Sequence, residues 1–273
     1  MPEQTAPFTP AEIGCGRVRF SSTGIFSTHK DHMVDPYVAT RIPKESQVEG
    51  TQYTPQAKGL FPAIVLLHDR WGLTVHIQTL AQQLACEGYI VLAPNLYGRQ
   101  GGMITANDEV AEALMNRLEE PLALQDINAC CEYLNTNIPE DSLLDNMKRN
   151  MHAVIGFGMG GGLAFQFAAR RRRLKAAVSF YGPLPDNSAQ LAKDLHCPLL
   201  CHAVDLNGSS SLEMMHQLQN QAKEAGKTID VLTYPDAPIG FCNQLNPTTY
   251  RPEAAQQAIT KTVEFLNGIL RPS

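Results

Sequence analysis

The sequence predicts an α/β protein built on a mostly parallel, doubly wound sheet. The residues Phe61–Leu67 form an almost continuous apolar run, which is typical of a strand buried on both faces. From there to the end of the chain, strand-like and helix-like runs alternate, as they do when helices cover both faces of a parallel sheet. The chain has 273 residues, of which 44% are hydrophobic, so one domain with a sizeable core accounts for it.

The elements follow one another at short intervals. After Phe61–Leu67, the apolar runs predict strands at Tyr89–Ala93, His152–Gly156, Lys175–Tyr181, Pro198–His202 and Thr228–Tyr234. Apolar residues at helical spacing predict helices around Ile77–Ala85 and at Asp108–Leu118, Leu122–Leu134, Gly160–Arg170, Leu212–Ala225 and Pro252–Leu270.

The beginning of the chain has a different pattern. Arg17–Ser21 and Pro36–Ile42 are interpreted as a leading antiparallel strand pair, and the polar stretch Lys44–Gly59 as a surface loop. We therefore expect residues 1–16 to be an N-terminal segment and residues 17–273 to form one domain.

Composition excludes several classes of protein. A share of 18% charged residues is too low for a disordered chain, and 27 acids against 22 Lys and Arg argue against a nucleic-acid partner. No stretch approaches the roughly 18 apolar residues that span a bilayer, and the polar start does not resemble a secretory signal. The seven cysteines have neither disulfide-framework nor CxxC spacing. We expect a cytoplasmic location and no metal or other cofactor.

Gly156–Gly161, with the sequence GFGMGG, joins a predicted strand directly to a predicted helix. A sharp turn of this kind is the nucleophile elbow of hydrolases, in which the central residue presents its side chain and the next amide helps to bind an oxyanion. Here the central residue is Gly158, followed by Met159, so the predicted elbow has no nucleophile. A dinucleotide fingerprint is the weaker alternative, because no acid follows at the usual spacing.

From Val34 to Leu270 the chain resembles the dienelactone hydrolase family, and the resemblance implies a single-domain α/β-hydrolase fold. Its segments match the early strand of the family, the H-E-x-x-G turn, the G-Y and A-P-D-L-Y-x-R segments, G-x-C-x-G-G, a later Tyr-Gly turn and Y-P-x-A-x-H-x-F. The matching residues are Asp35–Ala39, His68–Gly72, Gly88–Tyr89, Ala93–Arg99, Gly156–Gly161, Tyr181–Gly182 and Tyr234–Phe241.

The family's activity would imply a Cys nucleophile, a His base and an orienting Asp that open a lactone through an acyl-enzyme. All three positions differ in this chain. Gly158 stands for the Cys, Asn207 falls near the Asp, and Ile239 stands for the His. The first hypothesis is therefore a non-catalytic relative that binds a small carboxylate or lactone, or a protein partner such as a second copy.

Other family positions are kept. Asp69 matches an acid beside the nucleophile, and Arg99 matches an arginine that resembles a clamp for the substrate carboxylate. A turn residue and an ion-paired arginine are the alternatives for these two. We expect His68 to line the oxyanion region, and Trp71, Tyr97 and Met159 to contribute to the pocket.

Two further hypotheses stay open. An enzyme could use a relocated constellation, with either Cys201, His202 and Cys242, or His68, Asp69 and Arg99 with a water, as reactive groups. Cys201 and His202 are neighbours on a predicted strand, however, and should point to opposite faces. A structural subunit with a vestigial pocket is the third hypothesis.

Overall fold

The computed structural model describes residues 6–22, 46–135, 146–204 and 210–271, and it divides into two compact units. The first unit comprises residues 1–66 and 71–152, and the second comprises residues 67–70 and 153–273. The strand β5 (Met147–Phe157) begins in the first unit and ends in the second. Each unit is described by itself.

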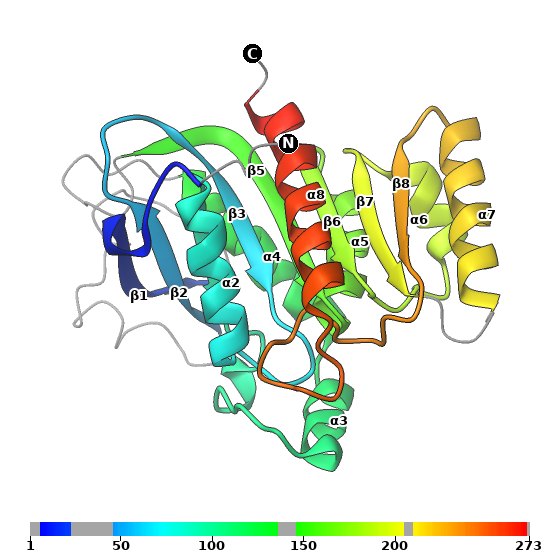
Figure 1. The fold of residues 1–273 in the computed structure, drawn as a ribbon, viewed down its shortest axis with the longest axis horizontal. Helices are drawn as coiled ribbons and strands as arrows, with labels where there is room; N and C mark the ends of the chain where they lie inside the picture. Colours follow the sequence, from blue (N-terminus) through cyan, green and yellow to red (C-terminus); the bar gives the residue numbers. More distant parts are fainter. Residues whose placement is uncertain (1–5, 23–45, 136–145, 205–209, 272–273) are drawn as a thin grey trace. The chain divides into compact units, whose positions relative to one another are not determined.

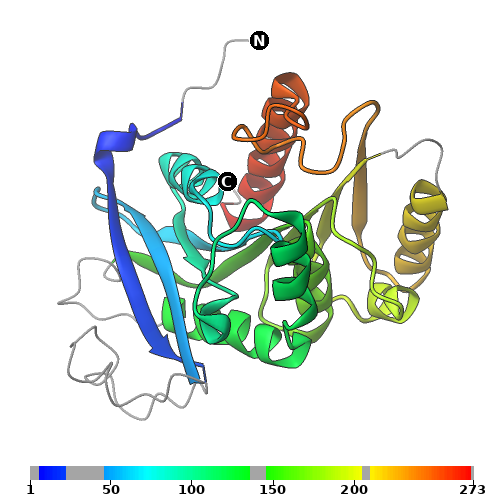
Figure 2. The same cartoon turned by 90° about the horizontal axis from the view of Figure 1, so that it is seen from below.

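In the described part of the first unit, the strands before β5 lie in the order β1-β2-β4-β3. β1 pairs with β2 and β2 with β4 in antiparallel fashion, whereas β3 and β4 are parallel. The helix α2 packs on β2 and β4 from one face, and α4 lies on the other face of the same strands (Figures 1 and 2). The elements are η1 (Pro10–Glu12), β1 (Ile13–Ser21), β2 (Gln47–Pro55), β3 (Phe61–Leu67), α2 (Val75–Cys86), β4 (Ile90–Pro94), η3 (Gly98–Gln100), α3 (Asp108–Asn116) and α4 (Glu120–Asn135).

The prediction of a surface loop at Lys44–Gly59 is wrong, because β2 occupies most of this stretch. Its inward positions alternate, as a strand requires, but two of them, Gln52 and Thr54, are polar and fully buried. Gln52 Nε2 donates to Thr54 Oγ1 at 3.1 Å, so part of this polar surface is satisfied within the strand. Because these residues are polar, the composition of β2 resembles that of a loop, and this explains the wrong prediction. The antiparallel N-terminal pair is confirmed with β2 as the partner of β1, and Pro36–Ile42 lies outside the described residues.

The second unit continues the alternation with parallel strands in the order β5-β6-β7-β8. The helix α8 covers one face of β6 and β7, and α5 lies behind β6 on the opposite face (Figure 1). Its elements are α5 (Met159–Arg170), β6 (Ala176–Phe180), α6 (Ser188–Asp194), β7 (Leu199–Val204), α7 (Ser210–Glu224), β8 (Ile229–Tyr234) and α8 (Pro252–Leu270). Of these, α6 is not predicted by the sequence, because its 7 residues are too few to show helical periodicity.

The predicted α/β class, with mostly parallel strands and an antiparallel pair at the N-terminal side, is confirmed. The apolar runs are the buried centre of each unit, as shown by the complete burial of residues 63–66 and 89–93 in the first unit and of residues 176–178 in the second. The domain boundary at residue 17 remains a prediction. None of the helices that the structure describes is long and apolar enough to cross a membrane.

Candidate functional site

The turn between β5 and α5 has the sharp form that the sequence predicts. Gly158 is the single residue between the strand and the helix, and its backbone has φ 50° and ψ −118°. Its N–H donates to the carbonyl oxygen of Phe180 at 3.0 Å, and its own carbonyl accepts from the amides of Gly161 and Gly162 at 2.8 and 3.2 Å. The conformation is thus held on both sides by backbone hydrogen bonds.

Close backbone packing explains the glycines around this turn. A Cβ on Gly156 would overlap the carbonyl group of Gly160, and a Cβ on Gly160 would lie 2.6 Å from the carbonyl oxygen of His68. The turn therefore presses against the chain that leaves β3, and only glycine permits that approach. This packing accounts for the glycine-rich pattern without a phosphate ligand.

Gly158 itself has room for a side chain. A Cβ at this position would lie 3.4 Å from Cβ of Asp69, which is an ordinary contact. A nucleophile at residue 158 would therefore stand beside Asp69. In this chain the position carries no side chain, so the turn presents no reactive atom.

His68 and Asp69 are both buried next to the turn. His68 Nδ1 lies 2.6 Å from the carbonyl oxygen of Asp69, and because a carbonyl only accepts, Nδ1 carries the proton. Burial lowers the pKa of His68 to about 4, so the ring is neutral at neutral pH. This arrangement orients the ring and the backbone of Asp69.

Tyr181 and Cys242 complete the surroundings of Asp69. Burial raises the pKa of Tyr181 well above its usual value, and the nearby Cys242 and Asp69 raise it further. Tyr181 has a positive φ of 40°, which is uncommon for a residue with a side chain. Burial also raises the pKa of the Cys242 thiol far above its usual value, so this thiol is not a ready nucleophile.

Cys201 and His202 lie on β7 and are not brought together as a reactive pair. His202 Nδ1 lies 2.8 Å from the hydroxyl of Tyr234, and Nε2 lies 2.8 Å from Oγ1 of Thr262. Its ring also stacks on Phe180 at 4.2 Å. Burial lowers the pKa of His202 to about 3 and raises that of Cys201 to about 12. Both ring nitrogens thus serve contacts to β8 and α8.

Two of the three divergent positions are described by the structure. Ile239, in the loop between β8 and α8, is 51% exposed and has no group that could move a proton. Gly158 is the second of these positions. Asn207, near the position of the family Asp, lies outside the described residues.

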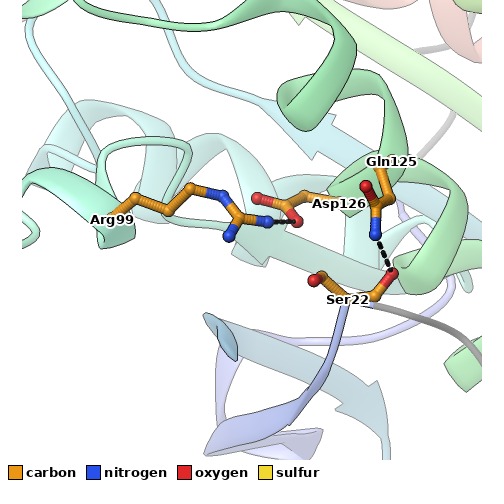
Figure 3. Close-up of polar contacts among 4 residues, drawn as sticks. All are labelled: Ser22, Arg99, Gln125 and Asp126. Carbon is orange, nitrogen blue, oxygen red and sulfur yellow. Dashed lines mark hydrogen bonds and ion pairs between the residues drawn. The ribbon is translucent and has the colours of Figure 1, made fainter. Parts of the chain in front are cut away.

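Arg99 belongs to the first unit and forms an ion pair with α4 (Figure 3). Arg99 Nη2 lies 2.5 Å from Oδ1 of Asp126, and the two side chains are only 20% and 9% exposed. On the same helix, Gln125 Nε2 donates to the carbonyl oxygen of Ser22 at 3.2 Å. Burial raises the pKa of Asp126 to about 6, although Arg99 acts in the opposite direction. In this structure Arg99 is therefore an ion-paired arginine, which is the alternative to a substrate clamp that the sequence left open.

The remaining predicted pocket residues are divided between the units. Trp71 and Tyr97 belong to the first unit with Arg99, while His68, Asp69 and Met159 belong to the second. Tyr97 is fully buried, and its carbonyl accepts from Gly102 at 2.8 Å. The carbonyl of Trp71 accepts from Thr105 at 3.1 Å, so both residues anchor the loop that follows Arg99.

Asp126, the ion-pair partner of Arg99, is a charged residue that the sequence analysis did not identify. Its neighbours Ala123, Ile127 and Cys130 are buried on the same face of α4. An acid at helical spacing among apolar residues signals a buried charge that needs a partner.

In the described part of the chain, no group of three or more His, Cys, Asp or Glu is arranged to hold a metal ion.

Residues 48–270 match the model of the dienelactone hydrolase family. The chain belongs to this family. A curated relative, named "Putative carboxymethylenebutenolidase", from Methylorubrum extorquens is 27% identical over 212 residues, which cover 74% of this chain and 70% of that protein.

Solved structures show the same fold. A dienelactone hydrolase-like promiscuous phosphotriesterase, P91, from metagenomic libraries aligns with a TM-score of 0.73 and 16% identity, over 94% of this chain and 99% of that one. Dienelactone hydrolase from Anabaena variabilis aligns with a TM-score of 0.60 and 18% identity, over 83% and 94%. At these identities the likeness establishes the α/β-hydrolase fold.

The glycines of the elbow should differ in their effect on stability. We expect Gly158→Ala to lower the free energy of unfolding by about 1–3 kcal/mol, the cost of an unfavourable backbone conformation. Gly156→Ala should cost more, because its overlap is with backbone that cannot turn aside. Gly268→Ala in α8, where nothing lies within 4 Å, is the matched control and should be neutral or stabilising. Urea unfolding of the three variants gives the order, and equal effects at residues 158 and 268 would contradict it.

Thiol labelling tests the relocated cysteines. Of the seven cysteines only Cys15 is exposed. We expect 5,5′-dithiobis(2-nitrobenzoate) to label one thiol rapidly in the native protein, and the others only after unfolding. Cys15→Ser should remove the fast phase. A fast phase that survives in this variant and is lost with Cys242→Ser or Cys201→Ser would show a reactive buried thiol instead.

The raised pKa of Asp126 predicts a pH-dependent stability difference. The folded protein binds a proton here more tightly than the unfolded chain does, so this contribution is present below about pH 4 and is lost as pH rises through about 6. Compared with Asp126→Asn, the wild type should therefore lose about 2–3 kcal/mol of stability between pH 4 and pH 7. Urea unfolding at several pH values measures this, with Glu120→Gln on the same helix as control. A difference between wild type and variant that does not change with pH would contradict it.

Proposed function

We propose that this chain is a non-catalytic member of the dienelactone hydrolase family that binds a small lactone or carboxylate through Arg99. Gly158 at the centre of an intact elbow carries the proposal. The turn that positions a nucleophile in this type of site is complete, and its central residue has no side chain.

The groups that could replace the nucleophile are unsuited to the task. Covalent catalysis needs an activated nucleophile and a base within hydrogen-bond reach. The Cys201 and Cys242 thiols are buried, with raised pKa values, and His202 uses both ring nitrogens for Tyr234 and Thr262. Ile239 offers no base. Within the described residues we therefore find no group placed to form an acyl-enzyme.

A carboxylate ligand is supported by the relative's name and by the hydrogen bonding of Arg99. That name specifies a carboxymethylenebutenolide, which is a lactone that carries a carboxylate. Among the described residues, Arg99 makes a single ion pair through Nη2, so most donors of its planar fork are not used by the protein. Arginine forks recognise carboxylates with two parallel hydrogen bonds.

A second candidate, hydrolysis without a covalent intermediate, is favoured by one observation. The carboxyl group of Asp69 lies close enough to Tyr181 to raise its pKa, and Cβ of Asp69 is 3.4 Å from where a Cβ at residue 158 would stand. A carboxylate there could take a proton from water, and a tyrosine hydroxyl could donate to a carbonyl.

An activity assay separates the two candidates. We expect the wild type to hydrolyse p-nitrophenyl acetate and dienelactone no faster than Gly158→Ala does, and to show no added acyl mass by mass spectrometry. In Gly158→Cys with Ile239→His, the intact elbow should let the new thiol acquire an acyl adduct. Wild-type turnover that disappears in Asp69→Asn would overturn the proposal in favour of the second candidate.

Ligand binding is measured separately by calorimetry. Dienelactone, with its free carboxylate, should bind the wild type, while its methyl ester, with the same ring but no charge, should bind at least tenfold more weakly. Arg99→Met should remove this preference. Equal binding of acid and ester by the wild type, or an unchanged preference in Arg99→Met, would refute the role of Arg99.

A further inference from the structure

The guanidinium of Arg99 already holds an anion that belongs to the protein itself. Asp126 Oδ1 lies 2.5 Å from Nη2, and Arg99 is the only charged group that the described residues pair with Asp126 (Figure 3). The contact joins residues 27 positions apart in sequence, on η3 and α4. An incoming carboxylate would therefore meet an arginine whose charge is partly balanced.

The turn that carries Arg99 has unmet hydrogen-bonding capacity. Arg99 Nε is enclosed and has no hydrogen-bond partner among the described residues, and the same is true of Oε1 of Gln100. The other end of the Gln100 amide donates to the carbonyl oxygen of Leu114 at 3.1 Å. Buried polar atoms without partners are unfavourable. The contact with Asp126 therefore leaves part of the Arg99 fork unsatisfied.

The position of Asp126 also makes it a strong competitor for Arg99. Its side chain lies on the buried face of α4, and burial, more than any neighbouring charge, sets its raised pKa. A carboxylate in this position is poorly solvated and depends on Arg99 for its stabilisation. Releasing the arginine would leave this buried charge uncompensated, so Asp126 competes strongly with a second anion for the guanidinium.

Building on the proposed function, we infer that Asp126 is an internal competitor for the Arg99 guanidinium and thereby sets the affinity of the protein for a carboxylate ligand. Its negative charge repels an anion that approaches the same fork, in a partly desolvated setting where such repulsion is screened only weakly. The described ion pair is therefore an autoinhibited arrangement of the binding residue.

The variant Asp126→Asn isolates the effect of the charge. Asparagine has nearly the same shape and keeps a side-chain oxygen that can accept from Arg99 Nη2, so the arginine stays oriented while the negative charge is lost. Asp126→Ser is a second uncharged variant with a smaller side chain, for use if the first does not fold. Glu120→Gln, at the exposed start of α4, removes the same charge from the same helix and is the matched control.

Calorimetric titration with dienelactone and its methyl ester tests the inference on folded protein. We expect Asp126→Asn to bind the acid at least tenfold more tightly than the wild type does, with no change for the ester. Glu120→Gln should bind both as the wild type does. Arg99→Met, alone or combined with Asp126→Asn, should show no preference for the acid.

The outcomes separate this inference from the proposed function. If the wild type prefers the acid through Arg99 but Asp126→Asn binds it equally or more weakly, then Asp126 positions Arg99 and the inference is overturned while the proposed function stands. If neither wild type nor Asp126→Asn prefers the acid, both are overturned. A preference for the acid that is present in the wild type, is larger in Asp126→Asn and is absent in Arg99→Met supports both the proposed function and the inference.

Discussion

The close backbone contact at the β5–α5 turn is the constraint on which the candidate site depends. Gly156 and Gly160 leave no room for side chains against each other and against the chain that leaves β3. Backbone hydrogen bonds to Phe180, Gly161 and Gly162 then hold Gly158 in its positive-φ conformation. None of these contacts uses a side chain at residue 158. The geometry of an elbow is consequently a property of packing, and it persists whether or not the central residue is reactive.

That independence explains how the site can lose its chemistry while the fold remains. A residue with a side chain at residue 158 would adopt a strained conformation, which proteins tolerate when function requires it. Glycine adopts the same backbone angles without that strain. A glycine at this position therefore avoids a backbone cost that a nucleophilic residue in the same conformation would carry. The same reasoning does not apply to Gly156, where a Cβ would overlap the carbonyl group of Gly160.

Periodicity in the sequence was sufficient to predict the strands and helices that bury apolar side chains. The strand at Phe61–Leu67 and the helix at Pro252–Leu270 were predicted with the bounds that the structure has. The strand β2 was missed because the polar residues Gln52 and Thr54 are fully buried in it, with one hydrogen bond between their side chains, and polar residues are not expected inside a core. The elbow was predicted because several glycines, at 156, 158, 160 and 161, fall where a predicted strand leads directly into a predicted helix. The partners of His202 and Arg99 come from residues 27 to 60 positions away, so their roles depend on tertiary contacts that single-sequence reasoning cannot supply.

At the candidate reactive and binding residues, the surroundings of the side chain do not support the role that the residue type alone suggests. Cys201, His202 and Cys242 are the residue types of a nucleophilic site, yet burial raises the pKa of both thiols and so disfavours the reactive thiolate, while Tyr234 and Thr262 engage both ring nitrogens of His202. Arg99 has the type of an anion clamp, and its environment supplies Asp126 as the anion. For the two cysteines and His202, burial and hydrogen bonding therefore oppose the reactivity that the residue types suggest. At Arg99, most donors of the guanidinium are not used by the described residues, but the buried Asp126 carboxylate depends on this arginine, so an approaching anion would have to compete with it.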